Sequence, residues 1–575
     1  MAGGLLTLLI LLPLLGAVAI GLLGRNDDRT RLTALAVSIA TLVLTLAAMT
    51  VYLRGNGSEL TQRLTWIGDS VDAEEAELLL YSVRIEYHVG LDGISLWLLV
   101  MTAILTPLAI AASFSGIRAR VKEYYALMLL LETGMLGVFC ARDLLLFYVF
   151  FEFTLVPLFF LIGIWGGPEK RRAANKFFIY TMAGSMLTFA AVLYVGWRAS
   201  QTFRVFTFAF EDLYRLADSL SATEQWWLFL ALFAGFAIKV PLFPLHTWLP
   251  LAHTEAPTAG SVILAGVLLK LGTYGLMRFN LRMLPDAAID LAPFMATLAI
   301  VGIVYGALVA WVQEDVKKLV AYSSVSHLGF CVLGMFSLTE AGLRGSLLYM
   351  INHGLSTGAL FLVVGMVYER YHTRSIHELG GLARKMPVMA FFLIVFTLSS
   401  IGLPGLNGFV SEFLVLLGTF TSAKDGGPLG WQYAVFAALG IILSAVYMLW
   451  MCQRVLFGPV VEPEGTPDAS AGLSQDLNRR EVAVLLPIAV LCLVLGLFPR
   501  LVLDSMGDDL DTLRERVSSA SLRNDGASTV AIYDDATSPK RKRGSSVRVD
   551  ARGTPWLALR AGRSPDLGGS IDARK

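Results

Sequence analysis

Apolar runs of about 20 residues recur along most of the chain, and they constrain its fold more than any other feature. A helix needs roughly this length to cross a ~30 Å hydrocarbon core. Hydrophobic residues make up 55% of the 575 residues, charged residues only 16%, and the mean hydropathy is +0.64. Because lipid offers no hydrogen-bond partner to a bare backbone, such runs must be helical or form closed barrels. The length of the runs predicts an all-α polytopic membrane protein.

A window of about 19 residues predicts about 14 transmembrane helices. The predicted spans are 4–24, 32–53, 92–114, 123–141, 143–165, 174–198, 226–249, 258–280, 291–312, 319–338, 343–368, 388–421, 431–457 and 481–501. The first run has no basic region before it, so we expect a retained helix rather than a signal peptide.

Basic residues are concentrated in the loops that follow odd-numbered spans, for example Arg25, Arg29 and Arg31 after the first. Cytoplasmic loops carry an excess of lysine and arginine. We therefore predict a multi-pass protein of the cytoplasmic (inner) membrane, with both termini on the outer, periplasmic side.

Four charged residues stand inside apolar runs: Glu152, Lys239, Lys270 and Glu412. A charge at membrane depth costs at least ~2.5–3.5 kcal/mol, so such residues face a protein interior or a water-filled cavity. A path for protons or other ions is the sharper hypothesis. The alternative is that a buried pair such as Glu152 and Lys239 only locks two helices together.

Three further titratable residues extend this set. His327 and His353 lie in apolar runs beside hydroxyl residues, and a neutral histidine can pass a proton through either ring nitrogen. Taken singly, each is more often a core histidine. Glu132 is an accessory candidate that could also bridge helices. The two histidines, together with Lys239, Lys270 and Glu412, predict a proton chain.

Two of the predicted spans should be interrupted. Pro241 and Pro244 follow Lys239, and a Gly402–Gly405 segment containing Pro404 precedes Glu412. Proline removes a helix hydrogen bond and clashes with the preceding turn. These broken helices, 7 and 12, are five spans apart and therefore run in opposite directions, which predicts two inverted five-helix repeats.

This predicts the following organisation: helices 1–3 (1–122), a first half with helices 4–8 (123–281), a second half with helices 9–13 (282–458), a loop and helix 14 (459–505), and a disordered hydrophilic tail (506–575). The tail contains a basic PKRKRG run at 539–544. In this context a solvated tail is a better interpretation than a nucleic-acid site, and we expect no nucleic-acid partner.

The chain carries no pattern for a redox cofactor or a metal. It has no glycine-rich dinucleotide fingerprint, and its four cysteines are far apart with no CxxC pair. We predict that this chain binds neither a metal nor a cofactor of its own.

The segment GFAIKVPLFPLHTWLPLAHTEAPTAGSVILAGVLLKLGTYGLMRF resembles the antiporter-like subunits of respiratory complex I, a superfamily shared with cation/proton antiporters and membrane-bound hydrogenases. VGLDGISLWL, FEFTLVPLFFLIGIWG and AYSSVSHLGF extend the resemblance over about residues 1–500. It implies 14 helices, with two inverted five-helix repeats and broken helices 7 and 12. The hydrophilic tail departs from the family pattern.

The resemblance also implies proton-transfer roles for Glu152, Lys239, Lys270, His327, His353 and Glu412. Glu152 would pair with Lys239, Lys270 would be the connecting lysine of helix 8, the histidines would be relay positions, and Glu412 would be the terminal group on the second broken helix. The L-type and N-type chains of complex I carry lysine at the position of Glu412, whereas the M-type chain carries glutamate. Glu412 therefore favours the M-type chain.

The implied function is outward proton pumping coupled to quinone reduction elsewhere in NADH–quinone oxidoreductase, as a non-redox subunit of this H⁺-translocating NADH:ubiquinone/menaquinone reductase. NADH, FMN, iron–sulfur clusters and quinone would then lie on partner subunits. The partners would be the L-type and N-type chains, small membrane subunits and the lipid bilayer. A subunit of a multisubunit Na⁺/H⁺ antiporter or membrane-bound hydrogenase, and a purely structural scaffold, remain alternatives.

Overall fold

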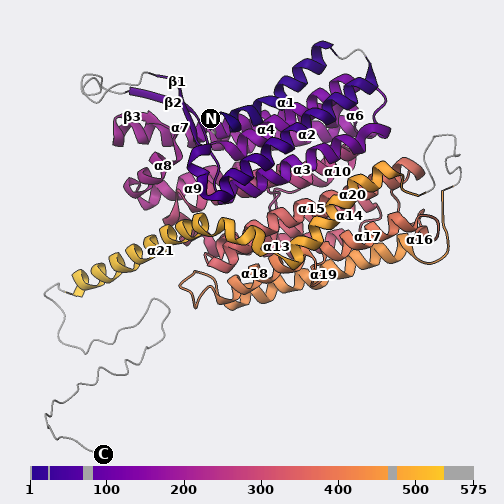
Figure 1. The fold of residues 1–575 in the computed structure, drawn as a ribbon. Helices are drawn as coiled ribbons and strands as arrows, with labels where there is room; N and C mark the ends of the chain where they lie inside the picture. Colours follow the sequence, from indigo (N-terminus) through magenta and orange to yellow (C-terminus); the bar gives the residue numbers. More distant parts are fainter. Residues whose placement is uncertain (1–2, 24–25, 69–81, 464–475, 537–575) are drawn as a thin grey trace, which may run out of the picture. The chain divides into compact units, whose positions relative to one another are not determined.

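The computed structural model describes residues 3–23, 26–68, 82–463 and 476–536. The chain divides into two compact units, residues 1–521 and 522–575. Long helices run alongside one another in the first unit (Figure 1). Within the described ranges, twelve helices are long and apolar enough to cross a membrane. The protein is a helical polytopic membrane protein, as its apolar runs predict.

The long membrane-spanning helices are α1 (Gly3–Leu23), α2 (Asp27–Val51), α3 (Gly93–Gly116), α4 (Val121–Cys140), α7 (Lys170–Phe203), α13 (Pro285–Trp311), α14 (Val316–Phe336), α15 (Glu340–Tyr371), α19 (Trp431–Leu456) and α20 (Arg479–Leu497). Two further spans are composite: α5 (Leu144–Phe153) with α6 (Leu155–Trp165), and α11 (Thr258–Ile263) continued by η4 (Leu264–Leu268), α12 (Leu269–Gly275) and η5 (Leu276–Leu281).

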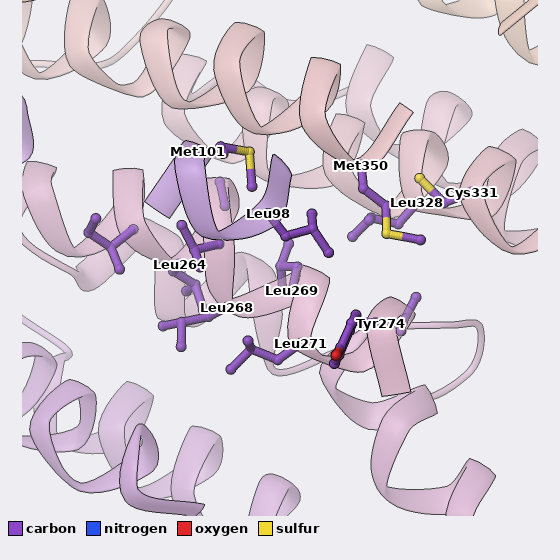
Figure 2. Packing of buried hydrophobic residues seen from close by; sticks show 14 of the residues in the cluster. Leu98, Met101, Leu264, Leu268, Leu269, Leu271, Tyr274, Leu328, Cys331 and Met350 are labelled. Atoms are coloured by element: carbon purple, nitrogen blue, oxygen red, sulfur yellow. The ribbon is translucent and has the colours of Figure 1, made fainter. Parts of the chain in front are cut away.

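Three of these spans form the centre of the unit. Thr258–Leu281, α14 and α15 are almost entirely buried by other helices, whereas α1 and α2 expose most of their surface. Figure 2 shows side chains of α3, Thr258–Leu281, α14 and α15 packed in one cluster. Glycines allow close approach here, because a Cβ on Gly354 would lie 2.3 Å from the Met101 sulfur. Titratable residues on these spans are therefore shielded from lipid.

Two predicted spans are interrupted in the structure. α9 (Ala222–Lys239) ends at the lysine, and the chain re-enters a helix only at α10 (Leu249–Glu255). Likewise, α17 (Pro387–Ser400) ends before Gly402 and Gly405, which have φ angles of +72° and +95°, and α18 (Asn407–Thr421) follows. Such left-handed angles suit glycine and stop a helix.

The connections contain structure that the apolar runs do not predict. A small sheet is formed by β1 (Gln62–Ile67), β2 (Ser82–Val89) and β3 (Val205–Thr207), in the order β1–β2–β3, with an antiparallel and then a parallel pair. The remaining short elements are η1 (Tyr52–Asn56), η2 (Gly57–Leu60), α8 (Phe210–Leu216), η3 (Ala217–Ser219) and α16 (Leu382–Lys385).

The prediction of a disordered tail from residue 506 is wrong for its first part. The chain forms α21 (Arg500–Ala536), and its early turns bury an apolar stripe: Val502, Met506, Leu510, Leu513, Val517 and Ala520. This spacing of three and four residues is that of an amphipathic helix, which the charged composition of the segment obscures. The basic run at 539–544 lies outside the described residues.

Candidate functional site

Lys239 lies at the end of α9 with its ammonium group turned toward the α5–α6 junction. Its Nζ donates to the Phe151 carbonyl at 2.8 Å and to the Thr154 hydroxyl at 3.4 Å. It also stands 3.5 Å from the centroid of the Phe151 ring. A buried ammonium must be hydrogen-bonded or paired, and here a carbonyl, a hydroxyl and an aromatic face meet that need.

The α5–α6 junction is a one-residue interruption at Thr154, and Pro157 lies one turn further along. Proline has no N–H to offer the carbonyl four residues back, which weakens the helix at this point. The Thr154 hydroxyl in turn donates to the Phe151 carbonyl at 2.8 Å. This third helix break lies directly beside Glu152, and Pro157 was the sequence signal that could have revealed it.

Glu152 is adjacent to Lys239 without forming an ion pair with it. The two charges interact electrostatically, but no salt bridge within the described residues joins them. Glu152 is half-buried, and its Oε1 is buried without a hydrogen-bond partner. The structure thus places the predicted pair together but with Lys239 bonded to the helix break.

Lys270 lies between two π-helical segments, η4 and η5. A π-helix shifts the backbone hydrogen bonds by one residue and often marks a functional site. The Lys270 Nζ uses the altered backbone, since it donates to the Ala265 carbonyl, and it also lies 2.7 Å from Nδ1 of His353. Lys270 belongs to the first predicted half and His353 to the second, so this contact crosses between them.

His353 and His327 are neighbours on α15 and α14. Their ring centroids are 5.6 Å apart, and both side chains are buried. His353 Nε2 is buried without a protein partner. A cavity of about 10 Å³ adjoins both histidines, and its wall includes Asn352, Ser356 and Ser400. A cavity of that size has room for about one water molecule.

Glu412 reaches His327 through a tyrosine. Nδ1 of His327 is 2.6 Å from the Tyr349 hydroxyl, which donates to Glu412 Oε1 at 2.7 Å. All three side chains are buried. The sequence analysis missed Tyr349, although its position four residues before His353 on α15 places both on one helix face.

The structure therefore separates the predicted residues into two clusters. The first contains Lys239 and Glu152. The second runs Lys270, His353, His327, Tyr349 and Glu412. Glu132 joins neither by a hydrogen bond: it is fully buried on α4, and both of its carboxyl oxygens are without a partner. No group of three or more His, Cys, Asp and Glu among the described residues is arranged to hold a metal ion.

Gly402 lies against the carboxylate of Glu412. A Cβ built on Gly402 would lie 2.2 Å from Glu412 Oε2, whereas one on Gly405 would meet nothing within 4 Å. Both glycines have positive φ angles that L-residues rarely adopt, so alanine strains the backbone at each.

Gly402→Ala is expected to displace the Glu412 carboxylate and to impair proton transfer to and from Glu412. Gly405→Ala is the matched control, which carries the strain without the collision. The measurement is proton uptake by reconstituted vesicles, alongside thermal stability. Equal activity in the two variants would show that the Glu412 position is not critical.

A second buried ionic cluster lies at the start of α3. Asp92 caps this helix by accepting from the Ser95 N–H at 3.0 Å, and it binds Arg142 at 3.0 Å and the fully buried Arg278. Arg278 also donates to the Tyr274 hydroxyl at 3.0 Å. Asp509 of α21 approaches the same place and accepts from the Gly93 N–H at 2.7 Å. The cluster joins α3, the Lys270 span and α21.

Comparison with known proteins finds one consistent family. Residues 141–428 match the family model described as NADH:quinone oxidoreductase/Mrp antiporter, TM. NADH-quinone oxidoreductase subunit M of Rhodobacter capsulatus is 42% identical over 514 residues, covering 88% of this chain and 95% of that protein. NADH-ubiquinone oxidoreductase chain 4 of Arabidopsis thaliana is 40% identical over 507 residues, covering 88% and 96%.

Solved structures give the same picture. A chain of respiratory complex I from Thermus thermophilus with bound NADH superposes with a TM-score of 0.75 at 31% identity, covering 89% of this chain and 99% of that one. A chain of an archaeal membrane-bound sulfane sulfur reductase has a TM-score of 0.74 at 22% identity, covering 96% and 88%. The latter shows likeness of fold alone.

Proposed function

The chain belongs to the family of NADH-quinone oxidoreductase subunit M, also named chain 4, and we propose that it moves protons along its buried lysines, histidines and glutamates. This family supplies a proton-translocating membrane subunit of complex I, a multisubunit, H⁺-translocating enzyme. The predicted membership is confirmed, including the M-type assignment that rested on Glu412.

The observation that carries the proposal is the contact between Lys270 and His353. A 2.7 Å distance between an ammonium nitrogen and an imidazole nitrogen allows direct proton transfer. It joins a lysine of the first predicted half to a histidine of the second. Both lie on spans that other helices surround, so the proton would be shielded from lipid. Such burial is costly, which is why intramembrane ionisable residues are presumed functional.

We propose Glu152 and Lys239 as the group that responds to the rest of the complex. In the structure the Lys239 ammonium is held by the Phe151 carbonyl and Thr154. Rotation toward Glu152 would stabilise its charge, and rotation back to the helix break would weaken that stabilisation. A displacement of α5 relative to α9 could thereby load or release a proton. Glu132, which is buried on α4 with neither carboxyl oxygen hydrogen-bonded, is proposed as an accessory acid.

The architecture proposed with this function has 14 helices in two inverted five-helix repeats. In support, α9–α10 and α17–α18 are both interrupted, beside Lys239 and Glu412 respectively. The proposed limits remain 1–122, 123–281, 282–458 and 459–505, with residues 506–575 following them. Both termini are proposed to lie on the outer side of the inner membrane, on the strength of the arginine and lysine distribution.

The proposed partners are the L-type and N-type chains and the small membrane subunits of complex I. NADH, FMN, iron–sulfur clusters and quinone are proposed to reside on other subunits, so that quinone reduction there drives outward proton movement here. Each proton moved outward works against about 2.3 kcal/mol per 100 mV of membrane potential.

The test uses the whole complex carrying Lys239→Ala or Glu412→Gln in this subunit. Both variants are expected to assemble and to lose quinone-coupled proton pumping, measured in vesicles together with NADH oxidation. Lys424→Ala is the control, because this lysine is exposed and lies beyond the end of α18, outside the buried clusters. An assembled Lys239→Ala complex that pumps normally would refute the proposed role.

A further inference from the structure

We propose that the Tyr349 hydroxyl carries the proton between His327 and Glu412. Tyr349 is not among the residues to which the resemblance to the family gives a role. The inference rests on the proposed function, because it specifies one step of that proton path. Tyr349 is the side chain that hydrogen-bonds to both His327 and Glu412 among the residues that the structure describes. Each of the three comes from a different helix: α14, α15 and α18.

With Glu412 as a carboxylate, the hydrogen bonds define the starting protonation of this triad. A tyrosine hydroxyl has one proton, and Tyr349 donates it to Glu412 Oε1. Nδ1 of His327, 2.6 Å from the same hydroxyl oxygen, must then bear a proton and donate it. A neutral imidazole holds one N–H, so Nε2 of His327 is the acceptor nitrogen. It faces the Ser400 hydroxyl at 3.3 Å, which donates to it.

The transfer step follows from this arrangement. A proton that binds Nε2 makes His327 an imidazolium. The Nδ1–H bond then breaks as a new O–H bond forms on Tyr349, while the original O–H bond of Tyr349 breaks and its proton binds Glu412 Oε1. The imidazolium and the carboxylate both become neutral. Tyr349 is neutral before and after the step, so the unfavourable ionisation of its phenol to a phenolate is avoided.

The structure also provides for delivery of the proton to Nε2 of His327. The cavity of about 10 Å³ is lined by both histidines and by Ser400. Nε2 of His353 is buried without a protein partner, and the two rings are 5.6 Å apart between centroids. One water in this cavity would bridge the two rings, which completes a path from Lys270 through His353 and His327 to Tyr349 and Glu412.

The test is Tyr349→Phe in the assembled complex, which removes one oxygen and leaves the ring. Proton pumping is expected to fall to the level of Glu412→Gln. The double variant Tyr349→Phe/Glu412→Gln is expected to pump no less than either single variant, because both interrupt the same step. Tyr124→Phe is the matched control: Tyr124 is equally buried, and its hydroxyl contacts Ser113 at 3.1 Å outside the path.

Pumping at the wild-type level by Tyr349→Phe, with Glu412→Gln impaired, would overturn the role of Tyr349 and leave the proposed function intact. Normal pumping by Glu412→Gln itself would refute the Glu412 end of the proposed path. If Tyr349→Phe does not assemble, Tyr349→Gln replaces it, since an amide keeps a donor and an acceptor but is a poor proton carrier. Impaired pumping by an assembled Tyr349→Gln complex supports the proposal, and wild-type pumping overturns it.

Discussion

Lys270→Met is expected to abolish quinone-coupled proton pumping. Methionine fills a similar volume but carries no transferable proton, so the contact with His353 across the two halves is lost. The complex is expected to assemble, because the change also removes a charge whose burial is costly. The measurement is the ratio of protons pumped to NADH oxidised in vesicles.

The control for Lys270→Met is Lys318→Met, which makes the same chemical change at an exposed position. Lys318→Met is expected to pump like the wild type. A Lys270→Met complex with an unchanged pumping ratio would contradict the path through Lys270 and His353.

Asp92→Ala is expected to produce the largest loss of stability. It leaves the fully buried Arg278 and its neighbour Arg142 without their carboxylate. Removing one member of a buried ion pair costs about 3–5 kcal/mol, and loss of the α3 cap adds about 1 kcal/mol. The thermal transition of the purified complex is the measurement.

Glu169→Ala is the control for Asp92→Ala, since Glu169 pairs with Arg172 at the surface, where both side chains are exposed. A surface pair contributes about 0–1 kcal/mol, so little change is expected. Asp92→Ala/Arg278→Met is expected to recover part of the lost stability, because the uncompensated buried charge is removed as well. Equal stability of Asp92→Ala and Glu169→Ala would show that the Asp92 cluster is not important for folding.

The residues of the candidate site were predictable from sequence where a charge interrupts an apolar run. Lys239, Lys270 and Glu412 are conspicuous for this reason. The free-energy cost of a charge in lipid predicts that they face the protein interior or a water-filled cavity. His327 and His353 were weaker predictions, because a histidine in a helix has several structural uses. Tyr349 was not identified at all, since a tyrosine is an ordinary member of an apolar run.

The helix interruptions, too, were only partly predicted from the sequence. The prolines after Lys239 and the glycines before Glu412 predicted breaks, because proline lacks a donor and glycine permits left-handed angles. Pro157 carried an equivalent signal beside Glu152 that was overlooked. The π-helical segments flanking Lys270 have no comparable sequence signal, because they depend on how that span packs against its neighbours.

The beginning of α21 illustrates a prediction that composition misled. Its serines, aspartates and arginines suggested a disordered tail, but six apolar residues at helical spacing lie against the rest of the unit. Charged residues of the same helix take part in specific contacts, as Asp509 does at Gly93. Periodicity was the better guide here than average polarity.

By itself, the sequence determined that this is a polytopic helical membrane protein, which residues must be shielded from lipid, and to which family it belongs. These properties follow from local quantities: the length of an apolar run, the desolvation of a charge and the backbone chemistry of proline and glycine. The tertiary structure alone decided which groups touch. Lys239 binds a carbonyl at a helix break rather than Glu152, and Tyr349 lies between His327 and Glu412. Hydrogen bonds form only within about 3.5 Å, and such distances between side chains far apart in sequence are set by the packing of the helices.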